Sequence, residues 1–263
     1  MKSKEFRNRA AMYVVGGLGN ILWYVSAFIN TYRFVPKVIP LCTPGTGDSR
    51  RALRMVRKFL KPDLIGKEEG SISRMSCVDN RWYQHKRWLV DKDVILNEVL
   101  NSNVLANANI NIADRYDLVI HHRGTDFKTS PAHTQCILKQ ADIDHVLNKL
   151  SASSKKYRER KLSVLVVTDD YKDASAKYPD YSIIHNEDEA VDFDIMLKAK
   201  NLLIYPGSTF SYWAGYLGDH ENVYLPAFNW PCDNYDIYDL TSASTSEDLA
   251  FPGATLIYST EDE

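Results

Sequence analysis

Short, continuous apolar runs alternate with amphipathic segments over much of this chain. Runs such as 162–167 (LSVLVV) and 201–205 (NLLIY) have few polar positions, so they predict parallel strands that are covered on both faces. The pattern predicts strands at 118–121, 162–168, 181–185, 201–205 and 223–225, with helices at 134–150, 172–177, 187–200 and 208–217 between them. This alternation is typical of an α/β fold with a doubly wound parallel sheet.

The N-terminal region contains a segment that looks like a signal peptide or a membrane anchor. Basic residues precede an uncharged run at 10–29, but Gly16, Gly17 and Gly19 lie inside that run and favour a tight turn over a spanning helix. The pattern predicts, in order, a buried strand at 12–15, a turn at 16–19, a helix at 20–32, a strand at 34–41, a helix at 48–61 and mixed helical and irregular structure from 62 to 109.

The chain has 263 residues, which is long enough for one large α/β domain or two small ones. The regular alternation is interrupted near 109–116. We therefore expect an N-terminal α/β domain over 1–115 and a C-terminal Rossmann-like domain over 116–263, with the C-terminal tail crossing back toward the first.

Composition excludes some classes of function and leaves one question open. The 32 basic and 34 acidic residues nearly balance, so bulk charge does not indicate a nucleic-acid-binding protein. Basic residues are nevertheless concentrated at 50–92, which indicates either a solvated helical face or a surface for an anionic partner. The four cysteines form no C-x-x-C pair, which favours reduced thiols in a cytoplasmic protein over a zinc or redox site.

Candidate ligand groups follow the predicted strands, where a parallel α/β sheet binds its ligands. The segments 16–20, 121–126, 168–170 and 206–211 together hold an arginine, carboxylates, hydroxyl groups and glycines. This set suits a phosphate-bearing ligand, because a guanidinium can grip an oxyanion with two hydrogen bonds and a helix that begins near Ser208 offers free N–H groups. Neither the G-x-G-x-x-G spacing nor a G-K-Ser/Thr sequence occurs at 16–20, so a nicotinamide dehydrogenase or a P-loop enzyme is not indicated.

Arg123 is the first candidate for catalysis, as the clamp for a departing diphosphate, and an ion pair with Asp117 or Asp126 is its structural alternative. Asp126 is a candidate general base, with a loop-ordering turn as the alternative. His121 is expected at the strand end, in contact with ligand or with the backbone. His122 is expected to point to the opposite face of the sheet.

Four motifs occur in a familiar order: GGLGN at 16–20, HHRGTDF at 121–127, VVTDD at 166–170 and DIMLKAKNLLIYPGSTFSYWAGYLG at 194–218. In these motifs the chain resembles the α-1,2-fucosyltransferases of glycosyltransferase family eleven. It differs where the family usually has a second arginine after Arg123, and where Gly207 replaces the usual asparagine. The resemblance implies a GT-B architecture of two Rossmann-type domains, a GDP-fucose donor held by the C-terminal domain, inversion at the sugar carbon and no metal.

The resemblance also assigns residues to the substrates. It implies that Asp194 accepts hydrogen bonds from guanine, although Asp192 and Asp194 are alternatively ordinary helix residues. Asp170 is expected to cap a helix and to contact ribose or base. The remaining candidates for substrate binding are Gly17, Gly19 and Asn20 in the N-terminal turn, and Ser208, Thr209, Phe210 and Ser211 at the start of a helix. Capping by Ser208 or Thr209 and core packing by Phe210 are the structural alternatives.

We therefore expect a metal-independent, inverting fucosyltransferase that needs no cofactor besides its GDP-fucose donor, and whose other substrate is a glycan acceptor. The N-terminal domain would face the acceptor. Another nucleotide-sugar transferase on the same scaffold, or a nucleotide- or carbohydrate-binding protein without turnover, is the alternative. We expect a cytoplasmic location, either free or at the inner face of a membrane, and no nucleic-acid partner.

Overall fold

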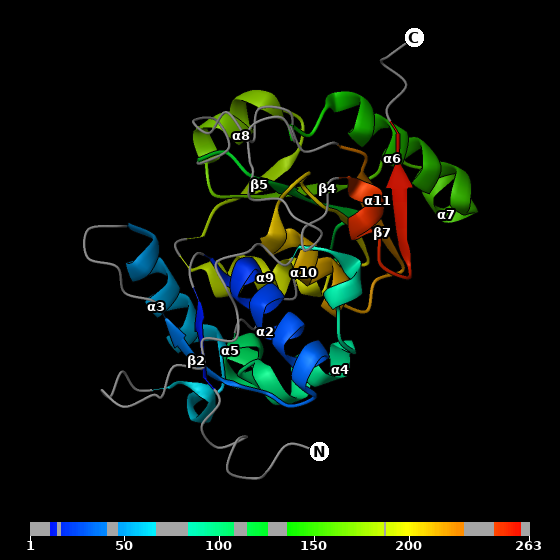
Figure 1. Ribbon diagram of the computed structural model, residues 1–263. Helices are drawn as coiled ribbons and strands as arrows, with labels where there is room; N and C mark the ends of the chain where they lie inside the picture. The colour runs from blue at the N-terminus through cyan, green and yellow to red at the C-terminus, as the bar shows by residue number, and fades with distance from the viewer. Residues whose placement is uncertain are drawn as a thin grey trace. The chain divides into compact units, whose positions relative to one another are not determined.

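The computed structural model describes residues 11–14, 17–40, 47–66, 84–107, 115–125, 136–186, 188–228 and 245–258 (Figure 1). The chain divides into two compact units. Unit 1 comprises Met1–Asn107 with Tyr235–Ala243, and unit 2 comprises Ala108–Asn234 with Ser244–Glu263. Each unit is described by itself below.

Unit 2 is built on a six-stranded sheet in which every pair of neighbours is parallel. The strands are β3 (Leu118–His122), β4 (Val164–Thr168), β5 (Ser182–Ile184), β6 (Asn201–Leu203), β7 (Asn222–Pro226) and β8 (Ala254–Ile257). The expected α/β fold with a parallel sheet is confirmed. The edge strand β8 adds a strand that the apolar pattern did not predict.

The order of the strands is β5-β4-β3-β6-β7-β8. The chain starts at the central strand β3, moves outward to β5, returns to β6 and then moves outward in the other direction. The carboxyl ends of β3 and β6 therefore diverge into connections that leave in opposite directions. Such a switch point forms a crevice in which open α/β sheets bind their ligands.

Helices cover both faces of this sheet, with α6 and α8 on one face and α9 and α10 on the other (Figure 1). The helices of unit 2 are α6 (Gln140–Ser153), α7 (Lys155–Arg158), α8 (Tyr171–Lys177), α9 (Glu189–Leu197), α10 (Thr209–Leu217) and α11 (Ser246–Leu249). All residues of β3 and β4 are buried, which explains why their sequences are continuous apolar runs rather than alternating ones.

The helix expected at 134–150 begins later than the pattern suggested. Residues 136–139 are not helical, and α6 starts at Gln140. Asp142 fixes this start, because its carboxylate accepts a hydrogen bond from the backbone N–H of Lys139 at 3.0 Å. A side chain that caps the helix from within its first turn sets the boundary independently of the apolar periodicity.

Unit 1 opens with the expected strand and helix, but the helix begins at Leu18 and so includes Leu18 and Gly19, which the pattern assigned to the turn. Its described elements are β1 (Ala11–Val14), α2 (Leu18–Tyr32), β2 (Lys37–Pro40), α3 (Gly47–Phe59), η1 (Pro62–Leu64), η2 (Lys86–Trp88), α4 (Lys92–Val94), η3 (Ile95–Val99) and α5 (Ser102–Asn107). β1 and β2 pair in parallel. The largely buried α2 packs within this unit, and among the described residues no helix has the length and apolar character needed to cross a membrane.

Candidate functional site

The two histidines at the end of β3 lie on opposite faces of the sheet, as expected for consecutive strand residues. His122 is buried, and its Nε2 lies 2.8 Å from Asp173 Oδ2 while its Nδ1 lies 3.3 Å from the hydroxyl of Tyr178. Burial lowers the pKa of His122 below its usual value, although the carboxylate of Asp173 opposes this shift. His122 therefore attaches α8 to the sheet, which is a structural role.

The loop that follows β3 is held by Asp169, the first residue after β4. Asp169 Oδ2 lies 3.2 Å from Arg123 Nε, and the same carboxylate accepts hydrogen bonds from the Gly124 N–H and the Thr125 hydroxyl, both at 2.7 Å. Burial alone would raise the pKa of Asp169, but the charge of Arg123 and the two hydrogen bonds outweigh it and lower the pKa. Asp169 is thus an anion that orients the arginine, a role that the sequence did not assign.

Gly124 permits the close approach of this loop to the neighbouring connection. A Cβ atom at residue 124 would lie 2.5 Å from the Cβ of Asp170, a distance that real side chains do not adopt. Asp170 itself caps α8, because its Oδ1 accepts a hydrogen bond from the Asp173 N–H at 3.1 Å. The capping role expected for Asp170 is present, and its position two residues after the end of β4 keeps it at the same carboxyl end of the sheet as Arg123.

His121 points to the side of the sheet that α10 occupies. Its ring is 3% exposed and lies in an edge-to-face arrangement with Tyr205, with 6.3 Å between the centroids. The ring of Phe210, in the first turn of α10, lies 6.0 Å away. The structure therefore brings together residues from the β3 motif and from the Ser-Thr-Phe motif, which are almost 90 positions apart in the sequence.

Helix α10 begins at the switch point, directly after β6. Ser208 occupies the N-cap position but makes no side-chain capping hydrogen bond, so the expected capping by this hydroxyl is not found. The buried Ser211 hydroxyl accepts from the Tyr205 N–H at 3.3 Å. Gly207 has a φ of 72°, in the left-handed region that glycine and asparagine tolerate best. Gly207 therefore meets the backbone requirement of the turn that leads into α10, and asparagine is the residue that would tolerate this conformation next best.

The two aspartates of α9 differ in their surroundings. Asp194 is 1% exposed and pairs with Lys198, whose Nζ lies 2.7 Å from its Oδ2, and burial raises its pKa. Asp192 is also buried and accepts a hydrogen bond from Asn186 Nδ2 at 2.5 Å. Burial raises the pKa of Asp192 to about 7, with smaller contributions from charged neighbours that include Asp169.

The hydrogen bond from Asn186, which follows β5, places Asp192 beside the carboxyl end of β5. The neighbouring His185 lies with its Nδ1 3.0 Å from the carbonyl oxygen of Thr168, the last residue of β4. The sequence argument preferred Asp194. Two positions along a helix are about 200° apart around its axis, so only one of the two carboxylates can face a given edge. The identity of that carboxylate depends on the rotation of α9, which the motif alone did not give.

The candidates in the N-terminal turn belong to unit 1. Gly17 is the N-cap of α2, and a Cβ atom placed on it would lie 3.4 Å from Nη2 of Arg51. Gly19 is buried in the first turn, and the Asn20 side chain accepts a hydrogen bond from Gln84 Nε2 at 3.2 Å. Gly17, Gly19 and Asn20 are therefore within one helical turn of each other.

Asp126 and Gly16 lie outside the described residues. Over the ranges that the structure describes, no three His, Cys, Asp or Glu side chains are grouped so as to hold a metal ion.

The family model described as glycosyl transferase family 11 matches residues 74–244. A comparison with curated proteins finds no match. Among solved structures, POFUT1 in complex with GDP-fucose is similar at 17% identity over 46% of this chain and 43% of that chain, with a TM-score of 0.30. POFUT1 in complex with GDP is similar at 17% identity over 46% of this chain and 44% of that chain, with a TM-score of 0.28. The chain thus spans less than half the length of these proteins.

Proposed function

Because this chain belongs to glycosyl transferase family 11, we propose that it transfers fucose from GDP-fucose to a hydroxyl group of a glycan acceptor, with inversion at the sugar carbon and without a metal ion. The family and the enzyme class expected from the motifs are confirmed by the family match, which covers well over half of the chain. The linkage, the inversion, the metal independence and the GT-B arrangement of two Rossmann-type domains belong to the proposal.

One observation carries the proposal. Arg123 follows β3 at the switch point of the sheet, and Asp169 holds it there through Nε. The side chain of Arg123 is 13% exposed, so the guanidinium is largely screened from water by protein. A cation fixed in such a place interacts more strongly with a diphosphate than a mobile cation in water does.

The chemistry requires a group that accepts negative charge as the donor breaks down. The acceptor oxygen forms a bond to the fucose anomeric carbon, and the bond from that carbon to the β-phosphate oxygen breaks. GDP departs with the bonding electron pair, and the acceptor proton passes to a base. Arg123 and the N–H groups at the start of α10 would stabilise the GDP leaving group, and Asp126 is the proposed base.

The nucleoside is proposed to lie along the carboxyl edge of β4 and beside α9. A carboxylate recognises guanine by accepting hydrogen bonds from N1 and N2. Asp192 supports this role better than Asp194, because its carboxylate is hydrogen-bonded to Asn186 beside the carboxyl end of β5, whereas Asp194 pairs with Lys198. Both remain candidates, with Asp170 proposed to contact ribose or base.

The remaining contacts are proposed from the position of each residue. The phosphates and the fucose would lie at the switch point of the sheet. They would be contacted there by His121, Ser208, Thr209, Phe210 and Ser211. In unit 1, Gly17, Gly19 and Asn20 would allow the backbone to approach the donor phosphates. The division at 115/116 into an acceptor-side and a donor-side domain is part of the same proposal, as is a cytoplasmic location, either free or at the inner face of a membrane.

The test is a donor panel with EDTA present. Purified protein is incubated with GDP-fucose, GDP-mannose, UDP-galactose or UDP-glucose, and the release of nucleoside diphosphate is measured with and without a mixture of oligosaccharides. We expect release from GDP-fucose alone, and a thermal shift with GDP but not with UDP. Release from a UDP-sugar would instead favour the alternative transferase, and GDP binding with no release from any donor would favour the protein without turnover.

A further inference from the structure

Tyr171 is the first residue of α8 and leaves its aromatic ring in solvent. The residue is 56% exposed, although a tyrosine ring is a large apolar surface that proteins tend to cover. In the part of the chain that the structure describes, the other large hydrophobic residues with comparable exposure are Ile137 and Tyr258. A single exposed aromatic residue needs no special explanation in itself, so its significance depends on where the ring lies.

Position 171 lies on the face of α8 that packs against the sheet. At 100° per residue, positions 174 and 178 fall within about 60° of position 171 around the helix axis. Ala174 is buried, and so is Tyr178, which ends the helix and whose hydroxyl lies 3.3 Å from Nδ1 of His122 in β3. Helical side chains lean toward the N-terminus of their helix, and α8 begins beyond the end of β4. The ring of Tyr171 therefore projects past the carboxyl ends of the strands.

This position is next to the clamp that holds Arg123. Asp169, whose carboxylate lies 3.2 Å from Arg123 Nε, precedes Tyr171 by two positions. Consecutive Cα atoms are about 3.8 Å apart, so the Cα atoms of residues 169 and 171 are separated by at most about 7.6 Å. The residue between them packs closely against the loop after β3, because a Cβ on Gly124 would meet the Cβ of Asp170 at 2.5 Å. A nucleotide held by its phosphates at Arg123 and extending toward β4 therefore passes the ring of Tyr171.

The carboxyl ends of β4 and β5 also carry the carboxylate proposed to recognise the base. The two strands are neighbours, and His185 Nδ1 lies 3.0 Å from the Thr168 carbonyl oxygen, which ties the two strand ends together. Asp192 lies beside the end of β5, where it accepts a hydrogen bond from Asn186 Nδ2. A purine base has hydrogen-bonding groups along its edge and an apolar face on each side of its ring plane. A carboxylate binds the edge, and an aromatic ring covers the face.

We propose that Tyr171 stacks on the guanine of the donor. This inference rests on the proposed function, which supplies the nucleotide, and it adds a residue that the motifs did not assign to the site. Stacking on an aromatic side chain tolerates any base, so Tyr171 would contribute affinity while the carboxylate contributes selection for guanine. Because the guanine does not react, the ring binds the ground state and the transition state equally, which lowers the KM and leaves kcat unchanged.

The experiment measures the Kd for GDP and the Kd for inorganic pyrophosphate by isothermal titration calorimetry. Pyrophosphate has the anionic groups of the ligand without its base. The variants are Tyr171→Ala, which removes the ring, and Tyr171→Phe, which keeps it. Tyr258→Ala is the matched control, because Tyr258 is 57% exposed and directly follows β8. β8 is four strands away from β4 in the sheet, a separation of roughly 19 Å.

We expect Tyr171→Ala to bind GDP about tenfold more weakly than the wild-type protein, as loss of one stacked base requires, and to bind pyrophosphate equally well. Tyr171→Phe and Tyr258→Ala should bind both ligands as the wild-type protein does. In steady-state kinetics, Tyr171→Ala should raise the KM for GDP-fucose about tenfold and leave kcat within about twofold. Unchanged GDP affinity in Tyr171→Ala, or an equal loss of pyrophosphate affinity, would overturn the proposal. A rise in the KM for the acceptor alone would also overturn it and would place the ring against the acceptor sugar.

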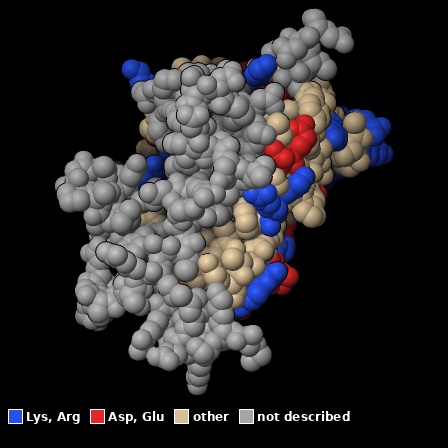
Figure 2. Space-filling model, viewed as in Figure 1, with Lys and Arg blue, Asp and Glu red and all other residues tan. Residues whose placement is uncertain are grey.

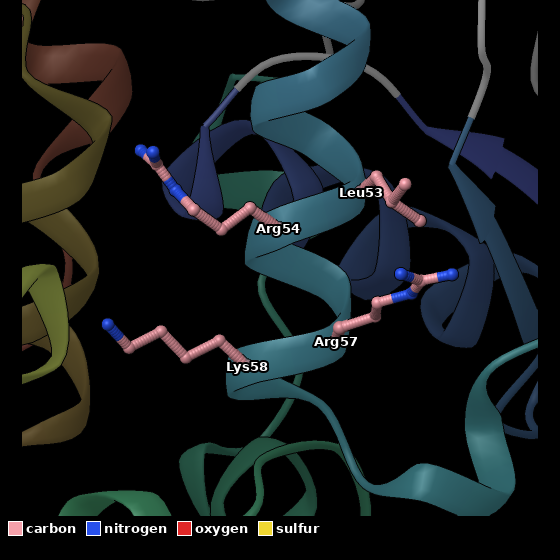
Figure 3. Close-up of a pocket in the computed structure, with 4 residues that line it drawn as sticks. All are labelled: Leu53, Arg54, Arg57 and Lys58. Carbon is pink, nitrogen blue, oxygen red and sulfur yellow. The ribbon is translucent and has the colours of Figure 1, made fainter.

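Basic surfaces elsewhere on the protein need a control, because they attract small anions without selecting among them. Lys and Arg atoms gather over α7 at the right of Figure 2, and a hollow of about 430 Å³ on α3 is lined by Leu53, Arg54, Arg57 and Lys58 (Figure 3). The variants Lys155→Gln/Lys156→Gln and Arg57→Gln lower the charge of these two surfaces. We expect neither variant to change the Kd for GDP or for pyrophosphate. A loss of GDP affinity in either one as large as that in Tyr171→Ala would overturn the stacking.

The release of GDP from GDP-fucose by the wild-type protein tests the proposed function without reference to Tyr171. If that release occurs and Tyr171→Ala binds GDP as tightly as the wild-type protein, only the stacking fails. If the wild-type protein binds no GDP, the proposed function fails, and the same comparison is made with ADP, UDP and CDP. A tenfold loss in Tyr171→Ala for the nucleotide that binds would retain the stacking, and any other result would overturn it. Melting temperatures check folding, which substitution of an exposed side chain should change little.

Discussion

Arg123 and Asp169 form an ion pair that joins the ends of two neighbouring strands, with 3.2 Å between Arg123 Nε and Asp169 Oδ2. Asp169 contacts the guanidinium at Nε. The same carboxylate also accepts hydrogen bonds from the next two residues of the loop, Gly124 and Thr125. The alternatives foreseen for an ion pair of Arg123 were Asp117 and Asp126. Asp117 instead pairs with Arg160. It directly precedes β3, so it lies at the amino end of that strand, whereas Arg123 lies at the carboxyl end.

Replacement of Arg123 by alanine should nearly abolish turnover. The loss of one preorganised donor to a developing oxyanion commonly costs on the order of 10²–10³ in rate. The measurement is GDP release from GDP-fucose at saturating donor, with the melting temperature as the check on folding. Arg123→Lys keeps the charge but loses the forked geometry of the guanidinium, so its activity should fall between that of the wild-type protein and that of Arg123→Ala. Full activity in Arg123→Ala would contradict the clamp.

Asp169→Asn should lower kcat more than it raises KM, because the variant keeps a side chain of the same size but releases the guanidinium from its anchor. A misplacement of about 1 Å can cost on the order of 10²-fold in rate, and we expect a loss of roughly 10- to 100-fold. Steady-state kinetics with GDP-fucose provide the measurement. Asp169→Glu retains the charge and serves as the comparison. A variant with unchanged kcat and only a lower melting temperature would show that Asp169 acts on stability alone.

Asp169 also predicts how the stability of the fold changes with pH. The pKa of Asp169 is lower in the folded protein than in the unfolded chain, so its ionisation stabilises the fold above the unfolded value of about 3.9. That stabilisation is lost as the pH falls through the folded pKa. Urea unfolding should therefore show wild type more stable than Asp169→Asn near neutral pH, with the gap closing in acid. A gap that stays constant between pH 7 and strongly acidic conditions would contradict this linkage.

The sequence predicted β3, β4 and β6 well because complete burial leaves a local mark, a continuous apolar run. It missed β8 because this edge strand is only partly buried and follows Pro252 and Gly253, which resemble a terminal turn. Arg123 was found because it directly follows a strand. Its partner Asp169 was not assigned, since that pairing depends on β3 and β4 being neighbours across 46 positions, which is a property of the sheet order and not of any motif.

Gly124→Ala should destabilise the protein because the new methyl group would meet the Cβ of Asp170 at 2.5 Å. Both atoms are attached rigidly to backbone, so the loop must shift, and overpacking of this kind typically costs about 1–3 kcal/mol. Thermal unfolding measures the effect. Gly17→Ala is the matched control, because Gly17 has a φ of −80° and its Cβ would make only ordinary contact with Arg51. Equal melting temperatures for the two variants would show that the loop accommodates a side chain.

Asp192 predicts how the affinity for GDP changes with pH. Its pKa is raised to about 7, and only the ionised carboxylate accepts two hydrogen bonds from guanine. With this pKa the ionised fraction rises from roughly one tenth at pH 6 to about nine tenths at pH 8, so the Kd for GDP should fall several-fold over that range. Asp192→Asn should bind GDP more weakly and without this dependence on Asp192 ionisation.

Asp194→Asn distinguishes the two aspartates. Asp194 pairs with Lys198, so its loss should disturb the helix more than the ligand, and the pH dependence of GDP binding should persist. Calorimetric titration at several pH values between 6 and 8 measures the Kd for GDP of the wild-type protein, of Asp192→Asn and of Asp194→Asn. If Asp194→Asn abolishes the pH dependence while Asp192→Asn keeps it, the guanine contact belongs to Asp194. In that case the rotation of α9 seen in the free protein changes when the nucleotide binds, because Asp192 and Asp194 cannot face one edge together.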